Sequence, residues 1–256
     1  MAALEIHQDA AAVARRGAGL FALAAQEGAA ARGAFTVALS GGNTPRGLYC
    51  LLAGGAFSSK IPWRRVHLYW GDERCVPPDD AASNYAMARA AFIDAVHVPD
   101  GNVHRVRGED APEEAAAAYA AELARPPLTA PQTPGLPVFD LVLLGLGADG
   151  HTASLFPHAA ALAEETRLAV VGQGGSGSGP RVTLTFPVIN AARRIVFVVT
   201  GGEKAGMVAE VLEGLRVPDA IPAQRVAPLY GSLLWLLDEA AAAELSPAAR
   251  AAARRG

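Results

Sequence analysis

The stretch FDLVLLGLGADGHTASLFP, residues 139–157, carries an apolar run that leads directly into a glycine-rich loop. The apolar run is typical of a buried strand, and the loop holds a G-x-G-x-x-G pattern at Gly145, Gly147 and Gly150. Glycines in this pattern after a strand are one part of the dinucleotide-binding fingerprint. The first hypothesis to test is therefore a dinucleotide site.

The surroundings of these glycines argue against a dinucleotide. The fingerprint also requires that the glycines open a helix and that an acid ends the next strand, about 20 residues on. Pro157 interrupts any helix begun at Gly150, and the next apolar run, RLAVV at residues 167–171, continues into GQGGSG without an Asp or Glu. We therefore expect a glycine loop that serves another ligand.

The order of strand, polar loop and helix recurs along the chain. FTVALS (35–40) and VHLYW (66–70) are typical of buried strands that lead into helices, and residues 193–214 repeat the order. Apolar strands that alternate with helices predict an α/β fold, an open, mostly parallel, Rossmann-like sheet with helices on both faces. We expect a single domain over residues 1–256, closed by an amphipathic helix over residues 228–245.

Composition and charge exclude two classes of partner. The chain has 22 Lys and Arg against 25 Asp and Glu, so it lacks the basic excess of a protein that binds nucleic acid through its phosphates. Its apolar runs are shorter than the roughly 20 residues of a membrane span, and the N-terminus lacks the pattern of a secretory signal. We expect a cytoplasmic protein with no nucleic-acid or membrane partner, in which Cys50 and Cys75 do not pair.

The loops at the carboxyl ends of the strands are the places where such sheets bind ligands. The first, SGGNTP, offers the backbone N–H groups of Gly41 and Gly42 and the hydroxyls of Ser40 and Thr44 at the start of a helix. This combination suits a phosphate. The alternative is an ordinary glycine turn with a threonine cap.

Charged residues gather in the loops of the next units. WGDERCVP places Asp72, Glu73 and Arg74 at a strand end, where the guanidinium could bind a phosphate or carboxylate, although three adjacent charges also suit a solvated loop. Arg181 and Lys204 each adjoin a later strand and could reach the same anion, or serve only as surface cations.

His151 is the candidate proton acceptor. Histidine titrates near neutral pH, and His151 lies in the glycine loop two residues after Asp149. We interpret the other histidines as structural or exposed; they are His7, His67, His97, His104 and His158. No group of Cys, His and carboxylates has metal-ligand spacing, so we predict neither a metal nor a cofactor.

Five ordered blocks resemble the 6-phosphogluconolactonase family, which also contains the glucosamine-6-phosphate isomerases. They are ALSGGNTPRGLY, WGDERCVPPDDAASNYAMA, LGLGADGHTASLFP, VTLTFPVINAARRIVFVVTGGEKA and IPAQRV. The resemblance implies hydrolysis of 6-phospho-D-glucono-1,5-lactone to 6-phosphogluconate, the second step of the oxidative pentose phosphate pathway. It also implies the fold of glucosamine-6-phosphate deaminase and ribose-5-phosphate isomerase.

The resemblance also assigns roles to residues. It implies that Ser40, Gly41, Gly42 and Thr44 form the phosphate loop, that Asp72, Glu73 and Arg74 form the acidic and basic block, and that Arg181 and Lys204 bind substrate. His151 is then the base that activates water, oriented by Asp149, while Arg74 or glycine N–H groups near Gly147 stabilise the oxyanion. Which cation serves which oxygen stays open.

Two other functions remain as alternatives. The related deaminase carries a glutamate where this chain has Phe156, and a Tyr where it has Arg74, so both positions favour hydrolysis. A sugar-phosphate sensor without chemistry should carry a DNA-binding segment or lack His151. We expect a small-molecule substrate and a monomer, with a weak homodimer as the alternative.

Overall fold

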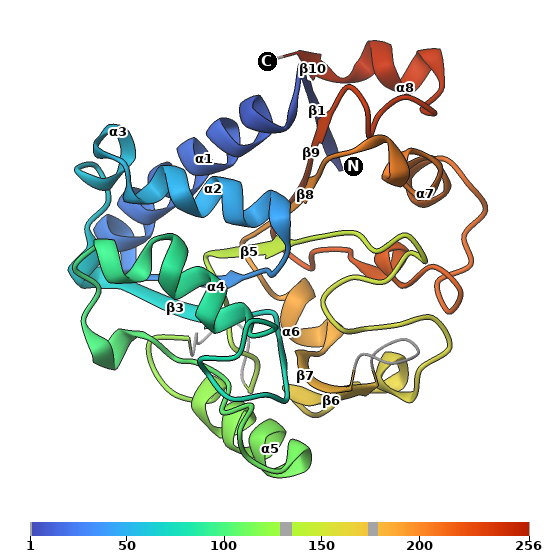
Figure 1. The fold of residues 1–256 in the computed structure, drawn as a ribbon. Coiled ribbons are helices and arrows are strands. Elements are labelled where there is room, and N and C mark those ends of the chain that lie inside the picture. Colours follow the sequence, from blue (N-terminus) through green and yellow to red (C-terminus); the bar gives the residue numbers. More distant parts are fainter. Residues whose placement is uncertain (1, 129–134, 174–178, 256) are drawn as a thin grey trace.

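The computed structural model describes residues 2–128, 135–173 and 179–255 (Figure 1). Its main sheet has the strand order β10-β1-β9-β8-β5-β2-β3, and every neighbouring pair is parallel. The strands are β1 (Ala3–His7), β2 (Phe35–Leu39), β3 (Val66–Trp70), β5 (Leu141–Leu144), β8 (Arg194–Val199), β9 (Ser232–Asp238) and β10 (Arg254–Arg255). The predicted open parallel sheet is confirmed.

Helices cover both faces of this sheet, because successive strand residues point in opposite directions. In β2, Val37 and Leu39 pack in one apolar cluster, whereas Ala38 packs in the other. The first cluster includes α1 (Ala10–Arg32), α2 (Asn43–Ala53) and α4 (Asn84–Ala91); the second includes α5 (Pro112–Leu123), α6 (Phe186–Asn190) and α7 (Ala205–Leu212). The prediction of helices on both faces is confirmed.

The helix ends follow local chemistry. The Asp9 side chain accepts a hydrogen bond from Ala12 N–H at the start of α1, and Gly33 ends that helix with φ +79°, a conformation that favours glycine. Ser83 caps α4, since its side chain accepts a hydrogen bond from Ala86 N–H. Short helices complete the chain at α3 (Gly55–Ser58) and α8 (Pro247–Ala252).

A small antiparallel sheet adjoins the main one and was not predicted. It consists of β4 (Asp72–Arg74), β7 (Pro180–Leu184) and β6 (Ala169–Gln173), in the order β4-β7-β6. Residues 72–74 were expected in a polar loop. They form a strand because β7 supplies backbone partners, and Leu184 N–H already bonds the Gly71 carbonyl at 2.9 Å. Residues 174–178, in the glycine-rich stretch that follows residues 167–171, lie outside the described residues.

The predicted closing helix over residues 228–245 is wrong. Its apolar run forms β9, a strand between β1 and β8 in the interior of the sheet. Leu236 packs in the cluster that contains α1, while Trp235 and Leu237 pack in the opposite one. Burial on both sides of a parallel strand outweighs the helix propensity of leucine. The neighbouring strand β1 was also not predicted.

Two further expectations concern thiols and membranes. Cys50 is exposed and Cys75 is half-buried, and both are free thiols, so the expectation that they do not pair is confirmed. Within residues 2–128, 135–173 and 179–255, none of the helices combines the length and the apolar character that a membrane crossing requires.

Candidate active site

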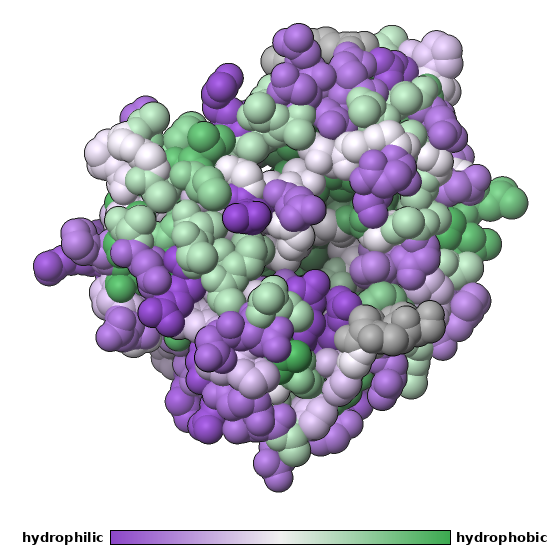
Figure 2. All heavy atoms as spheres, viewed as in Figure 1, coloured by the Kyte–Doolittle hydropathy of each residue, from purple (hydrophilic) through white to green (hydrophobic). Residues whose placement is uncertain are grey.

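A cavity of about 230 Å³ lies at the carboxyl ends of β2, β5 and β8, beside the small sheet. Figure 2 shows a hollow near the centre of this face with hydrophilic side chains around it. Most of the predicted site residues line the cavity: Ser40, Gly41, Gly42, Asp72, Arg74, Gly147, His151, Arg181 and Lys204. The loops that were chosen because ligands bind at strand ends therefore meet at one cavity.

The glycines of the loop after β5 place His151 at the cavity. Gly147 N–H donates to the His151 carbonyl at 2.8 Å, and Gly150, with φ +81°, donates to the Gly147 carbonyl at 3.1 Å. A methyl group on Gly147 would collide with His151 Nδ1 and Asp149 Oδ1. The glycine pattern thus serves a tight turn beneath a histidine and not a nucleotide.

His151 and Asp149 form a hydrogen-bonded pair. The Nδ1 of His151 lies 2.5 Å from Asp149 Oδ1, and the two side chains are 26% and 50% exposed. Partial burial acts to raise the pKa of Asp149, but the hydrogen bond and charge of His151 outweigh it and lower that pKa. The pair directs Nδ1 to the carboxylate and leaves Nε2 for another partner.

The structure restricts the donors available to an oxyanion. Gly147 lines the cavity, but its N–H is already bonded to the His151 carbonyl. Of the candidates predicted by the sequence, the Arg74 guanidinium also lines the cavity.

Phe156 lies against two of these side chains. Its ring centroid is 4.3 Å from that of His151, and the guanidinium carbon of Arg181 lies 5.6 Å from the same ring. Phe156 is 8% exposed. An apolar ring therefore packs against both the imidazole of His151 and the cation of Arg181.

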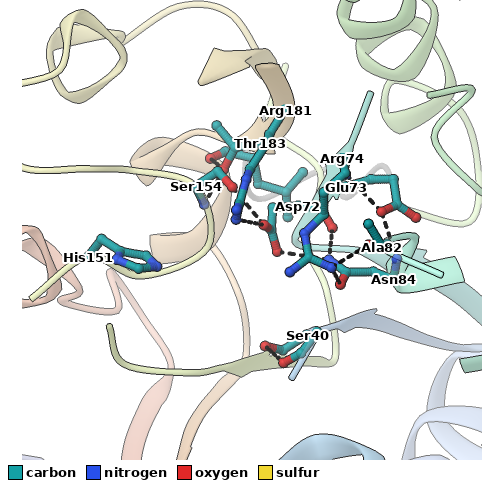
Figure 3. A network of polar contacts seen from close by, with 12 residues as sticks. Ser40, Asp72, Glu73, Arg74, Ala82, Asn84, His151, Ser154, Arg181 and Thr183 are labelled. Carbon is teal, nitrogen blue, oxygen red and sulfur yellow. Dashed lines mark hydrogen bonds and ion pairs between the residues drawn. The ribbon is translucent and has the colours of Figure 1, made fainter. Parts of the chain in front are cut away.

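Arg74 and Arg181 are cross-strand neighbours in the small sheet, and Figure 3 shows their side chains near Asp72. Like charges opposite one another are unfavourable. Burial lowers the pKa of Arg181, Asp72 opposes this effect, and the positive charge of Arg74 adds to it. Asp72 lies between them: its Oδ2 accepts from Ser154 Oγ at 2.6 Å and lies 3.9 Å from Arg181 Nη1. This arrangement of cations favours an anionic ligand.

The first glycine loop brings the amino end of α2 to the same cavity. Tyr49 holds the backbone of Ser40, since its hydroxyl accepts from Ser40 N–H at 3.0 Å and donates to the Ser40 carbonyl at 2.9 Å. Gly42, with φ +102°, precedes the helix. The Thr44 hydroxyl lies 2.7 Å from the Thr200 hydroxyl, so this predicted phosphate ligand joins the first turn of α2 to the residue after β8.

Asn84, the first residue of α4, also lines the cavity and was not predicted as a site residue. Its Oδ1 accepts from Arg74 Nη1 at 2.6 Å, and its Nδ2 donates to the Asp72 carbonyl at 2.8 Å (Figure 3). Only its position after the Ser83 cap could have drawn attention to it. Glu73 accepts three hydrogen bonds from the start of α4 and a fourth from Arg74 N–H, and burial raises its pKa.

Fold and site together define an α/β protein with a cationic cavity suited to a small anion and a histidine–carboxylate pair at its wall. In the described part of the chain, no three His, Cys, Asp or Glu side chains come together as a metal site.

Comparison with known proteins specifies the family. The chain belongs to the family of glucosamine-6-phosphate isomerases and 6-phosphogluconolactonase, whose model matches residues 8–235. A 6-phosphogluconolactonase from Synechocystis is 45% identical over 219 residues, which cover 85% of this chain and 88% of that protein. The structure of 6-phosphogluconolactonase from Trypanosoma cruzi is 29% identical with a TM-score of 0.84, covering 96% of this chain and 97% of the other. A monomeric glucosamine-6-phosphate deaminase, 20% identical with a TM-score of 0.78 over 95% of this chain and 100% of the other, shares the fold.

Proposed function

We propose that this protein is a 6-phosphogluconolactonase, which hydrolyses 6-phospho-D-glucono-1,5-lactone to 6-phosphogluconate. The observation that carries the proposal is the His151–Asp149 pair, 2.5 Å apart, at a cavity that Arg74, Arg181 and Lys204 also line. A base beside three cations suits the hydrolysis of a phosphorylated ester. Relatives named 6-phosphogluconolactonase support the same substrate.

His151 acts as the general base in this proposal. Its Nδ1 is bonded to Asp149, so Nε2 takes a proton from water while the water oxygen bonds to the lactone carbonyl carbon. The carbonyl electrons move onto oxygen, and Arg74 stabilises that charge. The intermediate then collapses, the bond to the ring oxygen breaks, and the ring oxygen takes the proton from His151. The product acid releases its own proton to solvent.

The cations and the first glycine loop bind the phosphate. Lys204 follows β8, Arg181 lies in β7, and Gly41 and Gly42 precede the amino end of α2. A helix amino end and positive side chains both favour a phosphate dianion. This leaves the Arg74 side of the cavity for the lactone ring.

Phe156 favours hydrolysis over deamination. Its ring packs against His151 and Arg181, so the position offers no carboxylate for the ring opening and proton transfer of a deaminase. Ammonia release from glucosamine-6-phosphate at a rate comparable to lactone hydrolysis would favour the deaminase.

The test couples freshly generated lactone to 6-phosphogluconate dehydrogenase and subtracts spontaneous hydrolysis. General base catalysis is worth about 100- to 10,000-fold, so His151→Asn should lose at least about 100-fold in kcat. His97→Asn is the matched control, because His97 is exposed and lies outside the cavity. A His151→Asn enzyme that keeps over half its rate contradicts the role of His151. Binding of 6-phosphogluconate without any acceleration by the wild type indicates a sensor.

We further propose that the chain acts as a single domain and a monomer in the cytoplasm. The main sheet contributes to both apolar clusters, which supports one folding unit. Sedimentation at several protein concentrations tests for the alternative, a weak homodimer.

A further inference from the structure

Asn84 lies in the wall of the cavity beside Arg74 and is 1% exposed. Both atoms of its carboxamide are used. Oδ1 accepts from Arg74 Nη1 at 2.6 Å, while Nδ2 donates to the Asp72 carbonyl at 2.8 Å and lies 3.4 Å from Asp72 Oδ1. One side chain therefore contacts two residues of β4 that face the cavity.

The backbone around Asn84 is fixed by the buried carboxylate of Glu73. That carboxylate accepts from Asn84 N–H at 2.8 Å, from Tyr85 N–H at 2.7 Å and from the Ser83 hydroxyl at 3.1 Å. The first turn of α4 is thereby joined to β4, although eight residues or more separate them in sequence. Asn84 is thus a rigid support for the side chain of Arg74.

Arg74 has an alternative direction to turn. Arg74 lines both this cavity and a second cavity of about 410 Å³. Asn84 also borders the second cavity, and Asp79 and Asp80 line it. Asn84 Oδ1 and the Ala82 carbonyl, both 2.6 Å from Nη1, hold the guanidinium at the boundary. Without Asn84, the carboxylates of the second cavity compete for Arg74.

We infer that Asn84 is a positioning residue, which keeps the Arg74 guanidinium turned toward the substrate and away from Asp79 and Asp80. The inference rests on the proposed function, in which Arg74 contacts the reacting lactone. A neutral amide suits this task because it accepts from Arg74 and donates to Asp72 at once, without adding a charge.

The first test compares Asn84→Ala with wild type in lactone hydrolysis and in calorimetric binding of 6-phosphogluconate. A hydrogen bond to a charged group is worth roughly 10- to 100-fold, so kcat/KM should fall by that factor. Ala90→Gly is the matched control: Ala90 is exposed in the same helix, lies outside the first cavity, and its side chain makes no hydrogen bond to Arg74, Glu73 or Asn84, so the variant should lose thermal stability but keep kcat/KM within about twofold. Asn84→Ser, which suits a first helical turn, replaces the alanine variant if that variant does not fold.

The second test is a double-mutant cycle, which separates positioning from general destabilisation. In an Arg74→Ala background, Asn84→Ala should lower kcat/KM by less than about threefold, whereas in a Lys204→Ala background it should keep its full effect of about 10-fold or more. Equal losses of kcat/KM in both backgrounds overturn the inference. It is also overturned if the kcat/KM of Asn84→Ala lies within twofold of wild type, or if Arg74→Ala is as active as wild type. Failure of the wild type to accelerate hydrolysis instead contradicts the proposed function.

Discussion

The ring of Phe156 packs against the imidazole of His151, with ring centroids 4.3 Å apart. The same ring lies 5.6 Å from the guanidinium carbon of Arg181. Phe156 therefore limits the movement of the proposed base.

Phe156→Leu should lower kcat by about 10-fold, because leucine fills part of the volume but offers no ring face to His151 or Arg181. Steady-state kinetics with the coupled assay measure this. Phe186→Leu is the matched control, since Phe186 lies 5.4 Å from the guanidinium carbon of Arg225 and does not line the cavity. Equal losses of activity in both variants would point to general destabilisation.

Asp149→Asn should lower kcat by at least about 10-fold while KM changes little. The amide cannot supply the negative charge that holds His151 Nδ1 at 2.5 Å, so the imidazole loses its fixed orientation. Stopped-flow or coupled kinetics of purified protein measure the change, and thermal unfolding checks the fold. An Asp149→Asn enzyme with unchanged kcat contradicts an orienting role.

Gly41→Ala should lower kcat/KM about as much as Asn84→Ala, by roughly 10-fold or more. Gly41 does not need a positive φ, but a methyl group there would collide with the Asn84 carboxamide. Gly101→Ala is the control, because a methyl group at Gly101 meets nothing within 4 Å. If Gly41→Ala lowers activity equally in wild type and in Asn84→Ala, then Asn84 is not the cause.

The stability of the protein should fall in mild acid because of His67. Burial, with a smaller effect from His104, lowers the pKa of His67 from 6.5 to about 4. The unfolded chain takes up the proton first, so this contribution to stability is complete above pH 6.5 and is lost as pH falls toward 4.

Urea unfolding between pH 7 and pH 4 measures this effect. We expect wild type to lose about 1 to 2 kcal/mol from His67, after allowance for partial exposure. His67→Gln should remove that part of the loss. His104, which pairs with Glu122 and whose pKa burial also lowers, accounts for part of the remainder. Parallel curves for wild type and His67→Gln would contradict this assignment.

The sequence predicts well where one physical signal dominates. The strands at residues 35–39 and 66–70 are apolar and bounded by polar loops, so their type and place could be inferred. Residues 232–238 could not, because leucine suits both a helix and a buried strand, and only the neighbours β1 and β8 decide between them. The strand at residues 72–74 depends in the same way on a partner over 100 residues away.

The residues of the candidate site likewise fall into those that the sequence could identify and those that depend on distant parts of the chain. His151, Arg181 and Lys204 carry chemical groups at strand ends, and their convergence could be expected from the topology. Asn84 carries no charge and begins a helix, so its contact with Arg74 depends on the path of the intervening loop. The occupied N–H of Gly147 likewise depends on the detailed shape of its turn.

The passage of the chain from β3 to β4 through Gly71 has a further consequence. Gly71 N–H bonds Leu39 at the end of the main sheet, and its carbonyl bonds Leu184 in the small one, so the two sheets meet at the cavity. A phosphorylated ligand that contacts Arg181 in the small sheet and Lys204, which follows β8 of the main sheet, would act as a cross-link between the two sheets. We therefore expect a ligand in the cavity to slow amide hydrogen exchange in β6 and β7. Binding of the product should then be measurable as protection of the small sheet, although that sheet forms only part of the site.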